Sequence, residues 1–276
     1  MKRKTDFKSM ALLIASVLAI IAVCSFLIGG TRTKEDTKKP DVEIPEVSVG
    51  SELPPTNGYI SFLGDSITTY EGWSNNADYN STIGNNGVYY NSSKMDVTDT
   101  WWYQVAKEAG YGLCVNNSWD GARVTDTKEG IPSGLERASQ LHNDNLGITP
   151  DVIIVYLGTN DIANEIDDDT VKNEFLNMMA DIVTNYPDAK IYACGVLPES
   201  RNVDDMGSLE YFNLKASEFA GTSDLLDYTF IDLNSLIPDW DYTTDTFVDG
   251  ELRVHPTAEG MDKITEAVLS VIQVEG

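Results

Sequence analysis

Two residue types in this sequence could together cleave an ester or amide bond. Ser66 follows directly on the apolar segment Tyr59–Leu63, where a hydroxyl would be presented at the end of a buried strand. A serine needs a general base to become a nucleophile at neutral pH, and histidine is the usual one. The chain has two histidines. His142 ends a polar stretch typical of a solvated surface, whereas His255 precedes a Pro-Thr pair at a predicted helix start, which makes it the stronger candidate base.

Two further segments supply hydrogen-bond donors. Asn160 lies in Gly158-Thr159-Asn160-Asp161, directly after the apolar segment Val152–Leu157. Gly121 ends the segment Asn117-Ser118-Trp119-Asp120-Gly121, where a glycine lets a backbone N–H approach a ligand. Because ligands of parallel sheets bind at the carboxyl ends of the strands, we expect these donors to lie near Ser66.

Alternating elements predict the sheet that would position these residues. Apolar runs predict strands at Tyr59–Leu63, Gly112–Val115, Val152–Leu157, Lys190–Val196 and Thr229–Leu233. Amphipathic stretches predict helices at Thr100–Ala109 (capped by Asp99), 133–142, 170–185, 208–220 and Thr257–Val271. Strands and helices in alternation favour an α/β fold, with helices on both faces of a parallel sheet.

The polar segments, in this order, resemble those of the SGNH, or GDSL, hydrolases, and the likeness runs from about residue 59 to 273. It implies a three-layer α/β/α sandwich with a central parallel five-stranded sheet, the flavodoxin-like SGNH hydrolase fold. It also implies a serine esterase without a cofactor, in which Ser66 is the nucleophile and His255 its base. The oxyanion hole would then be formed by the N–H of Ser66, the N–H of Gly121 and the side-chain amide of Asn160.

One position departs from the family pattern. An aspartate is normal three residues before the histidine, but Leu252 stands there. Asp249 is our choice for the orienting acid, as if three residues had been inserted after Gly250; Glu251 is the alternative. Because Asp-Gly between apolar segments also predicts a two-residue hairpin, a Ser-His dyad with a backbone carbonyl as the orienting group stays open.

Several other charged residues have simpler roles. We expect Asp65 to brace the nucleophile loop, Asp161 to brace Asn160, and Arg123 to form a structural salt bridge. The run 167–169 is expected to be a helix N-terminus, which favours negative charge, rather than a cation site.

Composition excludes several classes of function. Residues 40–276 carry 41 acidic against 11 basic residues, about −30, so binding to nucleic acid is not expected. With two histidines, three cysteines and no CxxC or HExxH motif, a zinc or iron site is not expected either, although carboxylates leave a hard-cation site open. Cys114 and Cys194, in separate predicted strands, are expected to be buried free thiols rather than a disulfide.

The N-terminus predicts export. Residues 1–9 are basic and Met10–Ile28 contain no charge over 19 residues, close to the ~20 that span a bilayer. We expect residues 1–30 to be a short cytoplasmic tip with a transmembrane anchor, or else a signal peptide. Residues 31–57, rich in proline and charge, predict a disordered linker. The hydrolase domain would comprise residues 58–276, outside the cell membrane or secreted, and would touch the membrane only through the N-terminal segment.

The substrate is predicted from one loop. Residues 70–99 contain six asparagines, four tyrosines and a tryptophan, and are expected to form a long ordered loop beside the first strand. With Trp101, Trp102 and Trp119, they favour acylated carbohydrate, most simply an O-acetylated polysaccharide or small molecule, because sugar rings stack on aromatic faces. The same aromatics could instead fill the core. A lipolytic esterase or thioesterase, and a non-catalytic carbohydrate-binding module, are the alternatives.

Overall fold

The computed structural model describes residues 57–74, 87–127, 130–203 and 206–272. The predicted anchor and residues 31–56 of the predicted linker lie outside the described residues. Asn57, the last linker residue, donates from its backbone N–H to the Gly110 carbonyl over 3.1 Å. Among the described residues, no helix combines the length and apolar character needed to cross a bilayer.

A five-stranded parallel sheet forms the centre of the described domain, and it confirms the predicted fold. Its order is β2-β1-β3-β4-β5. The strands are β1 (Tyr59–Gly64), β2 (Gly112–Ser118), β3 (Val152–Tyr156), β4 (Lys190–Cys194) and β5 (Thr229–Ile231). Gly64 pairs with Ser118 on one side and Tyr156 on the other, so β2, β1 and β3 end side by side.

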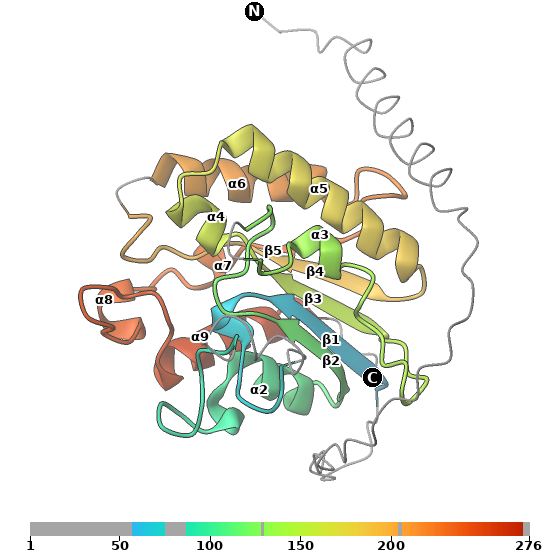
Figure 1. The fold of residues 1–276 in the computed structure, drawn as a ribbon, viewed down its shortest axis with the longest axis horizontal. Helices are drawn as coiled ribbons and strands as arrows, with labels where there is room; N and C mark the ends of the chain where they lie inside the picture. The colour runs from blue at the N-terminus through green and yellow to red at the C-terminus, as the bar shows by residue number, and fades with distance from the viewer. Residues whose placement is uncertain (1–56, 75–86, 128–129, 204–205, 273–276) are drawn as a thin grey trace, which may run out of the picture. The chain divides into compact units, whose positions relative to one another are not determined.

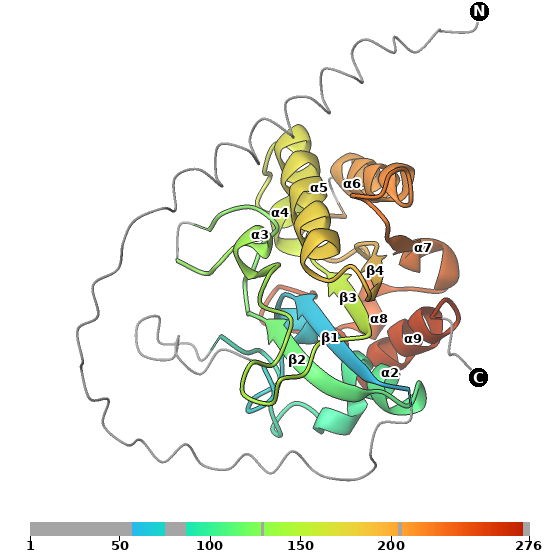
Figure 2. The same ribbon diagram turned by 90° about the vertical axis from the view of Figure 1, so that its right-hand side faces the viewer.

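Helices cover both faces of this sheet. One face carries α3 (Gly134–Arg137), α5 (Asp168–Asn185) and α6 (Met206–Phe219), and the other carries α2 (Trp101–Glu108) and α9 (Ala258–Leu269) (Figures 1 and 2). Short helices fill the connections: η1 (Ser66–Thr68), η2 (Val97–Asp99), α4 (Thr159–Ala163), α7 (Leu233–Leu236) and α8 (Tyr242–Asp245). The three layers follow because alternate residues of the buried strands face opposite helix layers.

Two apolar clusters fill the space between the sheet and the helices, one on each face. Phe62 and Ile154 face α2 and α9, while Ile153 and Val155 face α5. On α5, Val171, Phe175, Met178, Met179 and Ile182 form the buried face that the helical spacing predicted. The pair Trp101 and Trp102 is fully buried in the first cluster, with 0% and 1% exposure, so these two rings fill the core and cannot stack on a sugar.

Some local predictions are wrong. The helix expected over 133–142 ends at Arg137, because the chain after it folds back into an antiparallel bridge between Asn143 and Ile148. Asp99 does not cap α2; its carboxylate accepts the N–H of Asp96 inside η2, and Thr100 stands at the N-cap.

The prediction for the two cysteines of the domain is confirmed. Cys114 and Cys194 are buried free thiols, since two strands separate β2 from β4.

Candidate active site

The turn after β1 presents Ser66 at the carboxyl edge of the sheet. Asp65 caps this turn, because its Oδ1 accepts the N–H of Ile67 over 3.0 Å, as the predicted brace. Gly64 is required by space: a Cβ there would stand 2.6 Å from Thr68 Oγ1. The turn is therefore tight, and Ser66 is only 4% exposed.

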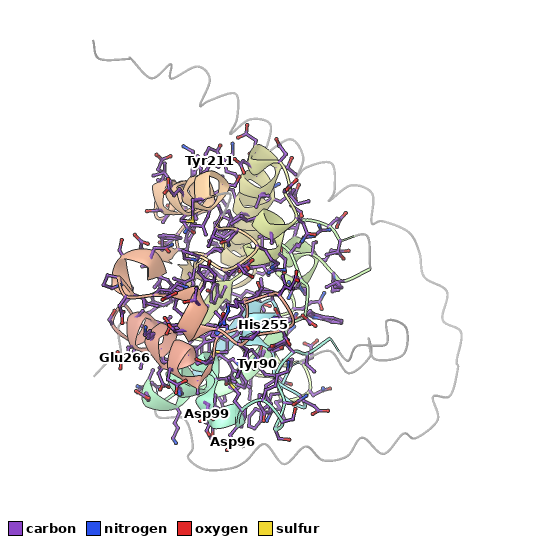
Figure 3. All side chains as sticks on the ribbon, turned by 90° about the vertical axis from the view of Figure 1, so that its left-hand side faces the viewer. Tyr90, Asp96, Asp99, Tyr211, His255 and Glu266 are labelled. Carbon is purple, nitrogen blue, oxygen red and sulfur yellow. The ribbon has the colours of Figure 1, made fainter. Side chains whose placement is uncertain are left out.

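His255 comes from the other end of the sequence and reaches this serine. Its Nε2 lies 2.9 Å from Ser66 Oγ, a hydrogen-bonding distance. The backbone around it is fixed: the His255 carbonyl accepts the N–H of Phe247 over 2.8 Å, and the Pro256 carbonyl accepts the Tyr90 hydroxyl over 2.9 Å. Thr257 caps α9 directly afterwards, as predicted. Figure 3 labels His255 and Tyr90, whose rings meet edge to face.

The protonation of His255 suits a base. Burial and, to a smaller extent, the nearby Arg201 guanidinium lower the pKa of its imidazole to about 3, while Asp249 opposes both effects. The ring is therefore neutral at neutral pH. With its proton on Nδ1, Nε2 is free to accept the Ser66 hydroxyl proton.

Asp249 lies beside the second ring nitrogen, but at a longer distance. Its Oδ2 is 3.8 Å from His255 Nδ1, which is ion-pair range and beyond a direct hydrogen bond. The predicted hairpin is also present, because Asp249 and Leu252 exchange two backbone hydrogen bonds around Gly250 at φ 65°. Glu251 lies exposed in the same turn.

A tyrosine of the long loop packs on the histidine ring. Tyr89 stacks on His255 with ring centroids 3.3 Å apart and planes 16° apart. Lys94 Nζ lies 3.4 Å from the Tyr89 centroid, so it must cover the opposite face. The Tyr89 hydroxyl donates to Asp249 Oδ2 over 2.5 Å. Residues 75–86 of this loop lie outside the described residues, and the described part supplies a side chain that touches the candidate base.

Asn160 occupies the first turn of α4, after β3. Gly158 before it has φ 128°, and a Cβ there would meet the Phe212 ring at 2.9 Å. The Asn160 Nδ2 donates to the Ala122 carbonyl over 2.9 Å, which leaves its second hydrogen for another acceptor. Its Oδ1 accepts from Arg201 Nη1 over 3.2 Å.

The segment with Gly121 is braced by an acid from α4. Asp161 accepts the N–H groups of Val124 and Thr125 over 2.8 and 3.0 Å. It therefore holds the chain after Gly121, whereas the sequence predicted that it would brace Asn160. Gly121 itself has φ 74°. The Gly121 N–H partly offsets the rise in the pKa of Asp120 that burial causes.

Sequence reasoning missed two arginines near the site, the buried Arg137 and the partly buried Arg201. Arg137 donates from Nη1 to the Gly64 and Asn117 carbonyls over 3.0 and 2.6 Å, tying the ends of β1 and β2 together. Arg201 lies in the loop after the carboxyl end of β4. A position after the carboxyl end of a strand is the signal that identified Ser66 and Asn160, and the same signal could have identified Arg201. Arg123, expected in a salt bridge, instead donates to the Asp126 carbonyl.

Other acidic residues lie apart from this site. Asp167 caps α5 through the N–H of Thr170 over 3.0 Å, so the acidic run is the predicted helix N-terminus. Asp245 is held by Lys263 Nζ at 2.9 Å. Within the described part of the chain, no three His, Cys, Asp or Glu side chains gather as metal ligands would.

Comparison with known proteins gives the family and the fold of this chain. The sequence profile of the GDSL-like Lipase/Acylhydrolase family matches residues 62–263. A Bacteroides uniformis protein classed with the GDSL-like lipases superposes with a TM-score of 0.53 at 22% identity, covering 78% of this chain and 94% of its own. TesA superposes with a TM-score of 0.52 at 16% identity, covering 77% and 96%.

A third similar structure is a family two carbohydrate esterase from Clostridium thermocellum in complex with cellohexaose. It has a TM-score of 0.53 at 18% identity and covers 79% of this chain and 64% of its own. No curated protein matches the sequence. At these identities the structures share the fold, and the family match carries the assignment: the chain belongs to the GDSL-like lipase/acylhydrolase family and is an ester hydrolase of the GDSL type.

Proposed function

We propose that the protein is an exported serine esterase in which Ser66 is the nucleophile and His255 the general base. The observation that carries this proposal is the 2.9 Å contact between Ser66 Oγ and His255 Nε2, formed by residues from opposite ends of the domain. The neutral state of the His255 imidazole at neutral pH is consistent with it, because an unprotonated Nε2 can accept the Ser66 proton. Export rests on the apolar N-terminal segment.

The first step forms an acyl-enzyme. Ser66 Oγ bonds to the ester carbonyl carbon as its proton moves to His255 Nε2, and the carbonyl electron pair moves onto oxygen. The N–H of Ser66, the N–H of Gly121 and the Asn160 amide hold this oxyanion. Collapse breaks the ester C–O bond, and the leaving alcohol takes the proton from His255. Water then repeats the sequence on the acyl-serine.

Asp249 is the orienting acid in this proposal, acting mainly through its charge. At 3.8 Å from Nδ1, it favours the imidazolium that forms in each step, consistent with its raising effect on the pKa of His255.

The substrate we propose is an O-acetylated carbohydrate. Trp119 is only partly buried and follows β2 directly. Its backbone N–H donates to the Gly64 carbonyl at the end of β1 over 3.3 Å, two residues before Ser66. The C. thermocellum carbohydrate esterase of the same fold binds cellohexaose. The groups that contact or electrostatically influence His255 are polar or aromatic, namely Ser66, Tyr89, Tyr90, Lys94, Arg201 and Asp249, which favours a short acyl group.

A lipolytic or thioesterase function is the second candidate. Val248 and Leu252 flank Asp249 in the hairpin and are 62% and 46% exposed. A long acyl chain could cover these two exposed apolar side chains, which lie beside the candidate site.

A fluorophosphonate probe tests the serine chemistry. We expect wild type to be labelled and Ser66→Ala to be unlabelled, with folding unchanged by circular dichroism. His255→Ala should hydrolyse esters at least about 10³-fold more slowly, because the nucleophile loses its base. If the wild-type protein were not labelled, the proposed serine mechanism would be wrong, and a non-catalytic carbohydrate-binding module would be favoured.

A panel of esters tests the substrate. Acetylated oligosaccharides and p-nitrophenyl acetate should be hydrolysed faster than p-nitrophenyl esters with long acyl chains. Activity on long-chain esters alone would remove the carbohydrate proposal and favour the lipolytic one.

A further inference from the structure

A guanidinium from the loop after β4 contacts one of the proposed oxyanion donors. Arg201 Nη1 donates to Asn160 Oδ1 over 3.2 Å. The side chain is 26% exposed, so it lies at the border of the site rather than in open solvent. Asn160 is itself buried. The contact therefore joins the positive charge of Arg201 to the Asn160 amide, the proposed donor to the oxyanion.

The loop holds this guanidinium in one place. Glu199, whose side chain is only 3% exposed, accepts Arg201 Nε over 2.8 Å and the Arg201 backbone N–H over 2.7 Å. The loop is also fastened to the chain before His255, because Ser200 N–H donates to the Arg253 carbonyl over 3.1 Å and Arg253 N–H donates to Ser200 Oγ over 2.8 Å. Glu199 thus fixes the Arg201 side chain, and the bonds between Ser200 and Arg253 fix the loop that carries it.

The chemical effect of this contact is on the amide hydrogens. A donor on Oδ1 fixes which end of the amide faces the Ala122 carbonyl, so the Nδ2 hydrogens point to their acceptors and the amide cannot turn over. A cationic donor also draws electron density from Oδ1, which makes the Nδ2 hydrogens stronger donors. Arginine remains charged at all working pH values, so the effect is constant.

We infer that Arg201 is a positioning residue of the oxyanion hole, holding and polarising the Asn160 amide so that it stabilises the charge on the substrate carbonyl oxygen. The inference rests on the proposed function. Because the oxyanion exists only after attack, the contribution belongs to kcat and leaves KM nearly unchanged.

Arg201 also acts on the candidate base through space. The charged and titratable groups that face His255 are Tyr89, Tyr90, Lys94, Asp249 and Arg201. Arg201 is the largest of the charges that keep the pKa of His255 low. Its removal therefore moves the acid limb of the kcat/KM profile to higher pH.

A double-mutant cycle on the full chain tests the inference. At a pH above the acid limb, Arg201→Gln should lower kcat by about 10–50-fold, less than the 10²–10³-fold expected for loss of one oxyanion donor in Asn160→Ala. In the Asn160→Ala background, Arg201→Gln should change kcat by less than about 3-fold, because its target is absent. Arg201→Lys should restore part of the loss.

Two controls separate this role from damage to the fold. Arg201→Gln leaves the buried Glu199 without its partner, so the pair Glu199→Gln/Arg201→Gln is measured as well and should show the same loss in kcat. Arg253→Gln removes an equal charge from a side chain that donates to the Thr243 carbonyl instead, and should keep wild-type kcat.

Equal losses in the wild-type and Asn160→Ala backgrounds would overturn the inference, as would an unchanged kcat in an active protein. An inactive, unlabelled wild type would instead overturn the proposed function.

Discussion

His255 approaches Ser66 with one ring nitrogen and faces an acid with the other, but the two contacts are unequal. The Ser66 contact is 2.9 Å, whereas the Asp249 contact is 3.8 Å. Tyr89 stacked at 3.3 Å restricts the ring more closely than the carboxylate does. An aromatic pair of this kind contributes about 0.5–1.5 kcal/mol beyond burial. At this site, ring packing therefore takes over part of the orienting work that a close aspartate would do.

Two substitutions of Tyr89 separate its ring from its hydroxyl. Tyr89→Phe keeps the stack and loses the hydrogen bond to Asp249, so we expect kcat/KM within about 3-fold of wild type. Tyr89→Ala loses both, and should lower kcat/KM by about 10-fold, which corresponds to ~1.4 kcal/mol. Steady-state hydrolysis of p-nitrophenyl acetate measures both effects.

The pH profile of Tyr89→Ala provides a second readout. Burial is the largest cause of the lowered pKa of His255, so opening the site to water should raise that pKa and move the acid limb to higher pH. If Tyr89→Phe and Tyr89→Ala lost equal activity, the hydroxyl on Asp249 would be the essential feature and not the stack.

At the scale of elements, the buried carboxyl of Asp65, in the turn between β1 and η1, lies near the buried guanidinium of Arg137 in α3 without a direct hydrogen bond. Asp65 Oδ2 and Arg137 Nη2 are both buried, and neither has a hydrogen-bond partner within the described residues. Burial raises the pKa of Asp65 to about 7 and lowers the pKa of Arg137 to about 9. The turn that presents Ser66 is therefore sensitive to the ionisation of one carboxyl group.

Asp65→Asn should reveal this sensitivity in the free energy of unfolding. The pKa of Asp65 is higher in the folded state than the unfolded value of 3.8, so its folded form retains a proton that the unfolded form has lost. Wild-type stability from this group is present below the unfolded pKa and falls as pH rises through the folded pKa. Asparagine keeps an acceptor for Ile67 N–H and does not ionise.

Urea unfolding at pH 5 and pH 8 measures the difference between the two proteins. Relative to wild type, Asp65→Asn should gain about 2–3 kcal/mol between these pH values, since roughly two pKa units of the shift lie inside the window. An equal difference at both pH values would mean that the carboxyl group is solvated or paired in solution.

The sequence was sufficient to predict the strands and the order of the polar segments, but not how the loops meet. Strands β1 and β3 are nearly continuous apolar runs, the pattern of strands buried on both faces, and Ser66 and Asn160 follow them directly. The contact of Tyr89 with His255 joins positions 166 residues apart. Neither residue lies in a regular element, so no periodicity indicated their pairing. The length of α3 was overestimated because a contact distant in sequence from the helix start, the Asn143–Ile148 bridge, turns the chain back after Arg137.

At the scale of the molecule, charge is the dominant property. The chain carries −25, and eight of its 19 basic residues lie before residue 40. Two cations lie near His255, but each is beside an acid: Arg201 with Glu199 at 2.8 Å and Lys94 with Asp249 at 3.9 Å. An approaching anion therefore meets a net negative field, with no unpaired cation near His255 among the described residues.

Ionic strength should therefore separate anionic from neutral substrates. The screening length falls from about 30 Å at 0.01 M salt to about 3 Å at 1 M, so repulsion of an anionic ester acts at low salt and is lost at high salt. We expect kcat/KM for the acetyl ester of a carboxylated nitrophenol to rise about 3-fold or more over this range. For p-nitrophenyl acetate, the neutral control, kcat/KM should change by less than about 2-fold, because a neutral ester is not steered by the field. A fall in kcat/KM for the anionic ester with salt would show that Lys94 and Arg201 attract the substrate in spite of their acidic partners, and would favour a carbohydrate that bears a carboxylate near the scissile ester.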